Sequence, residues 1–146
     1  MLDSRASDVV LEVLRAIEER CQDRVAELYH PEIEFHWPPG LPYSGVYQGE
    51  SVATMRERFA STWLPLQPDE ETRRMHGRVV ATGDDGRVVA NYVWKGKDAT
   101  GRRFETETLA DYLVRDGRLA RAQMFYYDLP GLIAFLDRAR QVGAGP

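Results

Sequence analysis

The stretch that decides the fold is Arg87–Asp128, RVVANYVWKGKDATGRRFETETLADYLVRDGRLARAQMFYYD. Its segments rich in β-branched and aromatic residues predict three consecutive antiparallel strands, at Val88–Lys95, Phe104–Val114 and Leu119–Tyr127. Asp116-Gly117 separates the last two segments, and this dipeptide is the strongest short hairpin signal that a sequence carries. The stretch therefore predicts an antiparallel meander.

Helices and shorter strands are expected around this meander. Apolar residues at spacings of three and four predict four helices, at Ser4–Arg20, Asp23–Tyr29, Glu50–Trp63 and Leu129–Arg140. Two further strands are predicted at Glu32–Trp37 and Thr72–Thr82, and a loop at Pro38–Gly49. Helices segregated to one face of an antiparallel sheet define the α+β class. A strongly curved sheet covered by helices on its concave face would form a cone with a cavity inside.

Length and composition favour one globular domain over residues 1–146, with residues 143–146 frayed. The net charge of -4 and the lack of a Lys/Arg-rich run argue against a nucleic-acid partner. No apolar stretch approaches the ~20 residues that a membrane span needs, so no membrane partner is expected. The single cysteine, Cys21, excludes an internal disulfide, and the chain lacks a signal-peptide pattern. These features predict a cytoplasmic protein.

Asp111 is the foremost candidate for a catalytic residue. Aspartate is disfavoured inside strands, so a specific role is expected for it. If it faces an apolar cavity, loss of hydration raises the pKa of its carboxyl group and suits it to general acid or base catalysis. Neither face of its strand is cleanly apolar, so alternation alone does not say which face points inward. The side chains of Glu105 and Glu107 are expected to be solvated or to pair with arginines on neighbouring strands. Glu107 is also kept as a candidate ligand contact.

No metal or cofactor is expected. The three histidines, His30, His36 and His76, have no metal-ligand spacing, and no cysteine or glycine-rich motif for a cofactor occurs. His36 alternates with Phe35 and Trp37, which places it on the outer side of its strand. It also lies at a strand end beside the Pro38–Gly49 loop, where the alternation can break, so it stays a lesser candidate for a general base. A surface or loop-anchoring histidine is the favoured interpretation.

Aromatic side chains are the expected walls of the cavity, since tyrosine and tryptophan combine apolar area with a polar group. The candidates for ligand contacts are Trp37, Tyr43, Phe59, Trp63, Tyr92 and Trp94. Tyr126 or Tyr43 is a candidate hydrogen-bond donor to a developing oxyanion. Such a cavity suits a small hydrophobic molecule that is flat or polycyclic.

Several phrases of the sequence resemble one known family. They are Phe35-His36-Trp37-Pro38, the run LPYSGVYQG at 41–49, Asp116-Gly117-Arg118-Leu119 and Tyr126-Tyr127-Asp128. In this order and spacing the chain, from about Val9 to Phe135, resembles the SnoaL-like branch of the NTF2-like superfamily, alongside the ketosteroid isomerases. The resemblance implies an α+β cone with a pocket at its open end, and a homodimer through the outer sheet face. Family members include isomerases, polyketide cyclases, epoxide hydrolases, dehydratases and proteins without catalytic activity.

The catalytic residues of the isomerases transfer only in part. Their proton-shuttling aspartate falls on Trp37, and their oxyanion-binding tyrosine falls on or next to Val13. Their second, protonated aspartate corresponds to Asp111, so one of the three catalytic residues is kept. The loss of the other two argues against steroid isomerisation as such. Arg103 and Asp111 alone do not establish the Asp-Arg-Asp set of the epoxide hydrolases.

Three hypotheses follow. The first is an enzyme that performs cofactor-free acid/base chemistry on a hydrophobic oxygenated substrate, of cyclase, isomerase or hydrolase type. The second is a ligand-binding module without catalysis. The third is a dimerisation domain whose cavity is filled by its own side chains.

Overall fold

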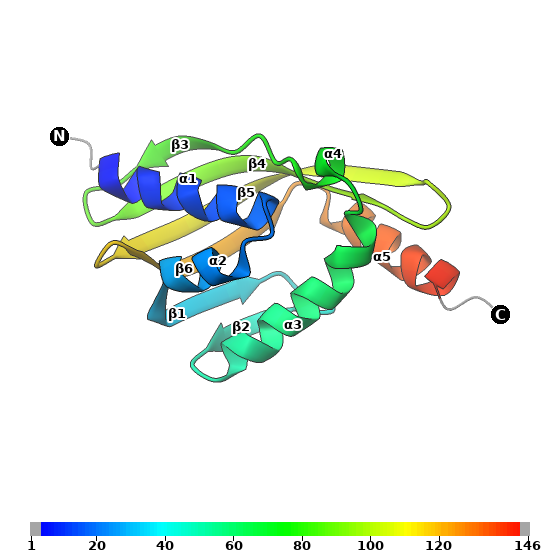
Figure 1. Ribbon diagram of the computed structural model, residues 1–146, viewed down its shortest axis with the longest axis horizontal. Coiled ribbons are helices and arrows are strands. Elements are labelled where there is room, and N and C mark those ends of the chain that lie inside the picture. The colour runs from blue at the N-terminus through cyan, green and yellow to red at the C-terminus, as the bar shows by residue number, and fades with distance from the viewer. Residues whose placement is uncertain (1–3, 144–146) are drawn as a thin grey trace.

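One six-stranded sheet carries the fold in the computed structural model, which describes residues 4–143 (Figure 1). The strands lie in the order β2-β1-β6-β5-β4-β3. Their bounds are β1 Tyr29–Trp37, β2 Gly45–Gln48, β3 Arg78–Thr82, β4 Arg87–Lys97, β5 Arg103–Arg115 and β6 Arg118–Tyr126. All neighbours are antiparallel except β1 and β6, which are parallel. The predicted meander is therefore confirmed as β4-β5-β6.

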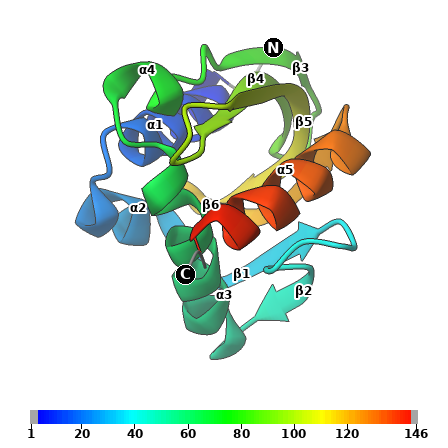
Figure 2. The same cartoon turned by 90° about the vertical axis from the view of Figure 1, so that its right-hand side faces the viewer.

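Helices cover one face and one end of this sheet. Their bounds are α1 Ser4–Glu18, α2 Gln22–Leu28, α3 Ser51–Trp63, α4 Glu70–Arg73 and α5 Leu129–Gly143, with a short 3-10 turn, η1, at Leu64–Leu66. Figure 2 shows the sheet curving into an open arc, with α1, α2 and α3 on one side and α5 across its end. The α5 residue Phe135 stacks on Phe104 of β5, with ring centroids 5.5 Å apart. The α+β prediction is confirmed, and the sheet does not close into a barrel.

The alternation of β5 identifies the covered face of the sheet. Thr106, Thr108, Ala110 and Tyr112 are buried, whereas Glu105, Glu107 and Leu109 between them are exposed. Because side chains alternate across a strand, the even-numbered residues of β5 point toward the helices and the odd-numbered ones point away. The core therefore lies on the concave side of the sheet.

Besides the 3-10 turn η1, two short elements were not predicted. The Pro38–Gly49 stretch contains β2, which pairs with β1 along Glu34–Trp37. The predicted strand at Thr72–Thr82 is correct only from Arg78, because its first residues belong to α4. Asp69 caps α4, since its carboxylate accepts the Thr72 backbone N–H at 2.9 Å.

Two predicted boundaries also differ from the structure. The second helix ends at Leu28, and Tyr29, His30 and Pro31 belong to β1 instead. The register of β1 on β6 shifts between Tyr29 and Glu34, so the missing N–H of Pro31 falls at an irregularity of the ladder. At the C-terminus α5 includes Gly143, and the rest of the tail predicted to be frayed, 144–146, lies outside the described residues.

No helix between residues 4 and 143 is long and apolar enough to cross a lipid bilayer.

Candidate ligand site

A cavity of about 130 Å³ lies between the concave face of the sheet and helices α1, α2 and α3. Strands β1, β4, β5 and β6 supply its floor, and the three helices with η1 supply its roof. The lining is mostly apolar and includes Met55, Met75 and Met124, whose flexible side chains adapt readily to a ligand. The volume is below the ~300–1,000 Å³ of typical small-molecule pockets, so a bound ring system requires some side chains to move.

A row of aromatic rings forms one wall of the cavity. Phe59 of α3 lies between the two indoles of the sheet, 5.4 Å from Trp37 and 5.5 Å from Trp94 between centroids. Trp63 meets Trp94 edge-on at 5.3 Å, and Tyr92 packs beside Trp94 at 6.3 Å. The structure thus brings together five of the residues expected to contact a ligand. Alternation places two of them there, because Tyr92 and Trp94 share the concave face of β4.

Tyr43 and Tyr126 lie behind this wall and do not line the cavity. The Trp63 indole N–H donates to the Tyr43 hydroxyl at 2.9 Å, and that hydroxyl lies 3.4 Å from the Tyr126 hydroxyl. Both tyrosines are buried, and burial raises the pKa of Tyr43 to about 12. The Tyr43 hydroxyl accepts from Trp63, and the Tyr126 hydroxyl contacts that of Tyr43. Neither hydroxyl is at the cavity surface, where an oxyanion donor was expected from Tyr126 or Tyr43.

Three other tyrosines line the cavity directly, namely Tyr29, Tyr92 and Tyr112. Burial raises the pKa of Tyr29 to about 12 and raises the pKa of Tyr92 and Tyr112 further above the ordinary value. Tyr92 and Tyr112 interact through their hydroxyl groups. These phenols stay protonated at neutral pH, so they can donate hydrogen bonds to a ligand oxygen but cannot serve as bases.

Two indole N–H groups in the wall have no hydrogen-bond partner. Nε1 of Trp37 and Nε1 of Trp94 are shielded from solvent, and no acceptor within residues 4–143 reaches them. An unsatisfied buried donor costs about 1–3 kcal/mol. Both indoles pack against Phe59, so a movement of this one ring changes the surroundings of both donors.

Asp111 lies on the convex face of the sheet, away from the cavity. Its carboxylate is 3.2 Å from Arg87 Nη2 and 3.8 Å from Arg121 Nη1, on the two neighbouring strands. The expectation that Asp111 faces the pocket is therefore corrected. Its neighbours Ala110 and Tyr112 point inward, and a period of two puts Asp111 on the opposite side. Two arginines explain an aspartate inside a strand without a catalytic site.

Glu107 and His36 also lie on the convex side. Glu107 is exposed on the same face of β5 as Asp111, so it does not contact the cavity. His36 is half-buried and its Nε2 lies 2.5 Å from Oε1 of Glu34, two residues earlier on the same face of β1. The alternation that places His36 opposite Phe35 and Trp37 agrees with this position. Leu109 and Phe125 are exposed nearby, and a homodimer through this face stays a prediction.

Some lining residues were missed in the sequence. Tyr112 shares its face with Thr106, Thr108 and Ala110, and these small side chains on one face were the available signal for space above β5. Arg20 and Arg56 carry no such signal, since arginines are usually solvated. Metal-ligating side chains (His, Cys, Asp, Glu) do not gather in threes anywhere in the part of the chain that the structure describes.

Comparison with known proteins identifies the family. The model of the SnoaL-like domain matches residues 10–122. No curated protein sequence matches the chain. Among solved structures, an NTF2-like protein of unknown function from Burkholderia pseudomallei K96243 has 17% identity and a TM-score of 0.73, and the match covers 90% of this chain and 97% of that one.

Two other solved structures have the same fold. TerC, co-crystallised with polyporic acid, has 16% identity and a TM-score of 0.73, over 91% of this chain and 98% of that chain. IdmH from Streptomyces antibioticus, a candidate polyketide cyclase, has 21% identity and a TM-score of 0.66, over 89% and 97%. At such identities the likeness concerns the fold alone, whereas the domain match covers most of the sequence. The chain belongs to the SnoaL-like domain family.

Proposed function

We propose that this protein binds a flat, largely apolar, oxygenated small molecule in the cavity under α1, α2 and α3. The observation that carries this proposal is the composition of the wall. Aromatic rings offer stacking surface, and the neutral phenols of Tyr29, Tyr92 and Tyr112 offer donors for ligand oxygens. A cavity used only as packing has no need of so many polar groups at its surface.

The unpartnered indoles add to this argument. A ligand acceptor that reaches Nε1 of Trp37 or Trp94 would remove the cost of a buried unsatisfied donor. Phe59 packs on both rings and is only half-buried, so it is the side chain whose rotation would admit a ring system. The structure of TerC with polyporic acid is in line with aromatic oxygenated ligands in this fold.

Blocking the cavity should abolish binding. Ala60 lines it from α3 and is half-buried, so Ala60→Trp places an indole in the opening. A panel of naphthols, naphthoquinones and hydroxyanthraquinones is tested by thermal unfolding. A compound present at 100 times its Kd should stabilise the wild type by about 2.7 kcal/mol, a shift on the order of 5–10 °C in Tm. Ala60→Trp should show no shift.

Asp111→Asn is the matched comparison for this screen. Because Asp111 lies on the convex face, its substitution should leave every ligand-induced shift unchanged. The binding proposal fails if no compound stabilises the wild type, or if Ala60→Trp responds as the wild type does.

A second candidate function is cofactor-free catalysis, of the cyclase or isomerase type. The observation that favours it is the pair of neutral phenols, Tyr92 and Tyr112, which could donate to an enolate oxygen as negative charge develops there. No carboxylate or histidine lines the cavity among residues 4–143, so a proton acceptor would have to be the substrate itself or water. IdmH, a candidate cyclase of the same fold, is consistent with this chemistry.

Loss of the Tyr92 hydroxyl should separate catalysis from binding. Compounds that stabilise the wild type are incubated with it, and products are followed by mass spectrometry. If one is converted, Tyr92→Phe should lower kcat by about 10²-fold, with the Kd changed only a few-fold. Tyr47→Phe, which removes a hydroxyl bonded to the Ser44 carbonyl outside the cavity, should leave kcat unchanged. Binding without conversion of any compound argues against catalysis and leaves the first proposal standing.

A further inference from the structure

The charges around the cavity are all of one sign. Two arginines, Arg20 and Arg56, belong to its lining, and no described aspartate or glutamate does. The chain as a whole carries a net charge of -4, so this local excess of positive charge runs against the overall balance. Inside a cleft with low-dielectric walls, such an imbalance favours an anionic ligand.

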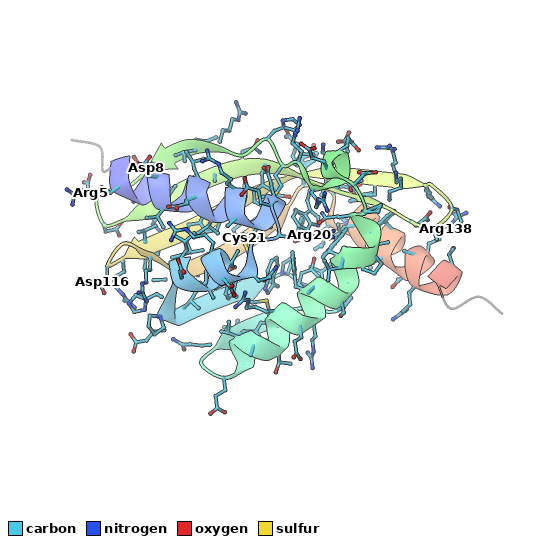
Figure 3. All side chains as sticks on the ribbon, in the orientation of Figure 1. Arg5, Asp8, Arg20, Cys21, Asp116 and Arg138 are labelled. Carbon is cyan, nitrogen blue, oxygen red and sulfur yellow. The ribbon has the colours of Figure 1, made fainter. Side chains whose placement is uncertain are left out.

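Arg20 is held in place without being neutralised. It lies two residues after the end of α1, with a φ of 55°, and Figure 3 shows it between the end of α1 and helix α3. Its guanidinium donates to the backbone carbonyl of Gln67 and lies 3.5 Å from that of Leu64. Loss of hydration and repulsion from Arg73 lower the pKa of Arg20, so a nearby negative charge would stabilise it.

Arg56 is fixed in a similar way. Its Nη2 donates to the side-chain oxygen of Gln22 at 3.0 Å, and its Cζ lies 5.4 Å from the centre of the Tyr29 ring. Both partners are neutral, so they orient the guanidinium and leave its charge uncompensated. No carboxylate within residues 4–143 forms an ion pair with either Arg20 or Arg56.

Several arginines outside the cavity are paired with carboxylates. Arg24 pairs with Glu12 and Glu27, and Arg103 pairs with Glu71. Solvated arginines commonly form such surface pairs. The two cationic residues in the cavity lining are instead oriented by neutral acceptors from α2, η1 and the chain after it. This is an arrangement in which an incoming anion meets preoriented donors.

We propose that the ligand of the cavity is an organic anion, whose carboxylate or equally acidic oxygen group binds Arg20 and Arg56 while its flat apolar body packs among the aromatic rings. This inference rests on the proposed function, because it specifies the ligand of the same cavity. Gln22 is exposed and Arg20 and Arg56 are half-buried, whereas Trp63, Tyr92 and Trp94 are buried, which puts the anionic end nearer to solvent and the body deeper. The hydroxyl groups of Tyr29, Tyr92 and Tyr112 can then donate hydrogen bonds to oxygen atoms on the buried end of the ligand.

Matched pairs of ligands test the charge separately from the shape. Benzoate, 2-naphthoate and anthracene-2-carboxylate are titrated by calorimetry beside the corresponding neutral carboxamides. The best carboxylate should bind the wild type about tenfold more tightly than its carboxamide, as expected for one charge-assisted hydrogen-bonded pair. Its affinity should fall with added NaCl, whereas that of the carboxamide should stay constant.

Substitutions test whether Arg20 and Arg56 cause the preference for carboxylates over carboxamides. Arg20→Gln and Arg56→Gln should each lower the carboxylate affinity several-fold and leave the carboxamide affinity unchanged. Arg56→Lys keeps the charge and should retain most of the preference. Arg58→Gln removes the same charge from an exposed position two residues further along α3, outside the cavity, and should have no effect. Thermal unfolding checks that every variant is folded.

The outcomes distinguish the two proposals. Equal affinity for carboxylates and carboxamides, both lost in Ala60→Trp, would overturn the anionic ligand and keep the proposed function. A carboxylate preference that survives in Arg20→Gln and Arg56→Gln would overturn the assignment to these two residues. Binding of neither series, together with no stabilisation by the oxygenated panel, would overturn both proposals.

Discussion

Replacing Trp63 by alanine is expected to lower the free energy of unfolding by about 3–5 kcal/mol. The side chain is only 2% exposed and is among the largest fully buried groups of the described chain. Its indole packs edge-on against Trp94, and its N–H donates to the Tyr43 hydroxyl at 2.9 Å. The truncation therefore removes apolar contacts, leaves a cavity and deprives a buried hydroxyl of its partner. Urea denaturation at equilibrium measures the loss.

A smaller substitution separates these contributions. Trp63→Phe keeps an aromatic ring but removes the N–H donor, and it should cost about 1–2 kcal/mol. Trp63→Ala should also enlarge the ligand cavity, because Trp63 lines it. If Trp63→Ala cost less than about 1 kcal/mol, the packing of α3 on the sheet described above would be incorrect.

Gly86→Ala is the substitution with the next largest expected effect, a loss of about 2–4 kcal/mol. Gly86 ends the turn between β3 and β4 and has a φ of +87°, which side chains rarely adopt. A Cβ there would lie 2.3 Å from the backbone carbonyl oxygen of Val114 on β5. The Val114 N–H is bonded to the Gly86 carbonyl at 2.9 Å, which keeps this part of β5 close to Gly86. The midpoint of urea unfolding reports the effect.

Gly101→Ala is its matched control. Gly101 has a nearly identical φ of +86°, but nothing lies within 4 Å of an added Cβ. It should therefore cost only about 1 kcal/mol, the conformational part of the penalty. The difference between the two variants measures the clash with β5. Equal losses would mean that the close contact with Val114 is relieved without cost.

Local rules were sufficient for much of the fold. The Asp116-Gly117 turn has positive φ at both residues, 55° and 72°, as the dipeptide predicts for a tight hairpin. Apolar spacing located α1, α3 and α5, because an amphipathic helix needs one apolar stripe facing the sheet. The short β2 and α4 were not predicted, because neither carries a local sequence pattern long enough to indicate it. The first depends on pairing with β1, and the second has only four residues around the Asp69 cap.

The aromatic wall of the site could likewise be anticipated. Tyr92 and Trp94 share a face of β4, and Phe59 and Trp63 fall on the apolar stripe of α3. Large aromatic residues on two facing elements are brought together wherever a helix covers a sheet. The sequence by itself therefore determined the α+β class, the meander and most of the rings around the cavity.

Only the tertiary structure decided which face of β5 points inward. Alternation sorts its residues into two sets, and both sets mix polar with apolar side chains, so neither is marked as the core. The helices cover the set that contains Thr108 and Tyr112. Asp111 is left on the convex face, where Arg87 and Arg121 from adjacent strands pair with it.

The presence of two arginines at the cavity also depends on the tertiary structure. Arg20 and Arg56 lie 36 positions apart in the sequence, and nothing local distinguishes them from solvated arginines. They line one cavity because the chain after α1 and helix α3 both cover the concave sheet, and neutral groups far along the chain fix their guanidinium groups. Sequence patterns report which face of an element is apolar, whereas the meeting of side chains from separate elements depends on how those elements pack.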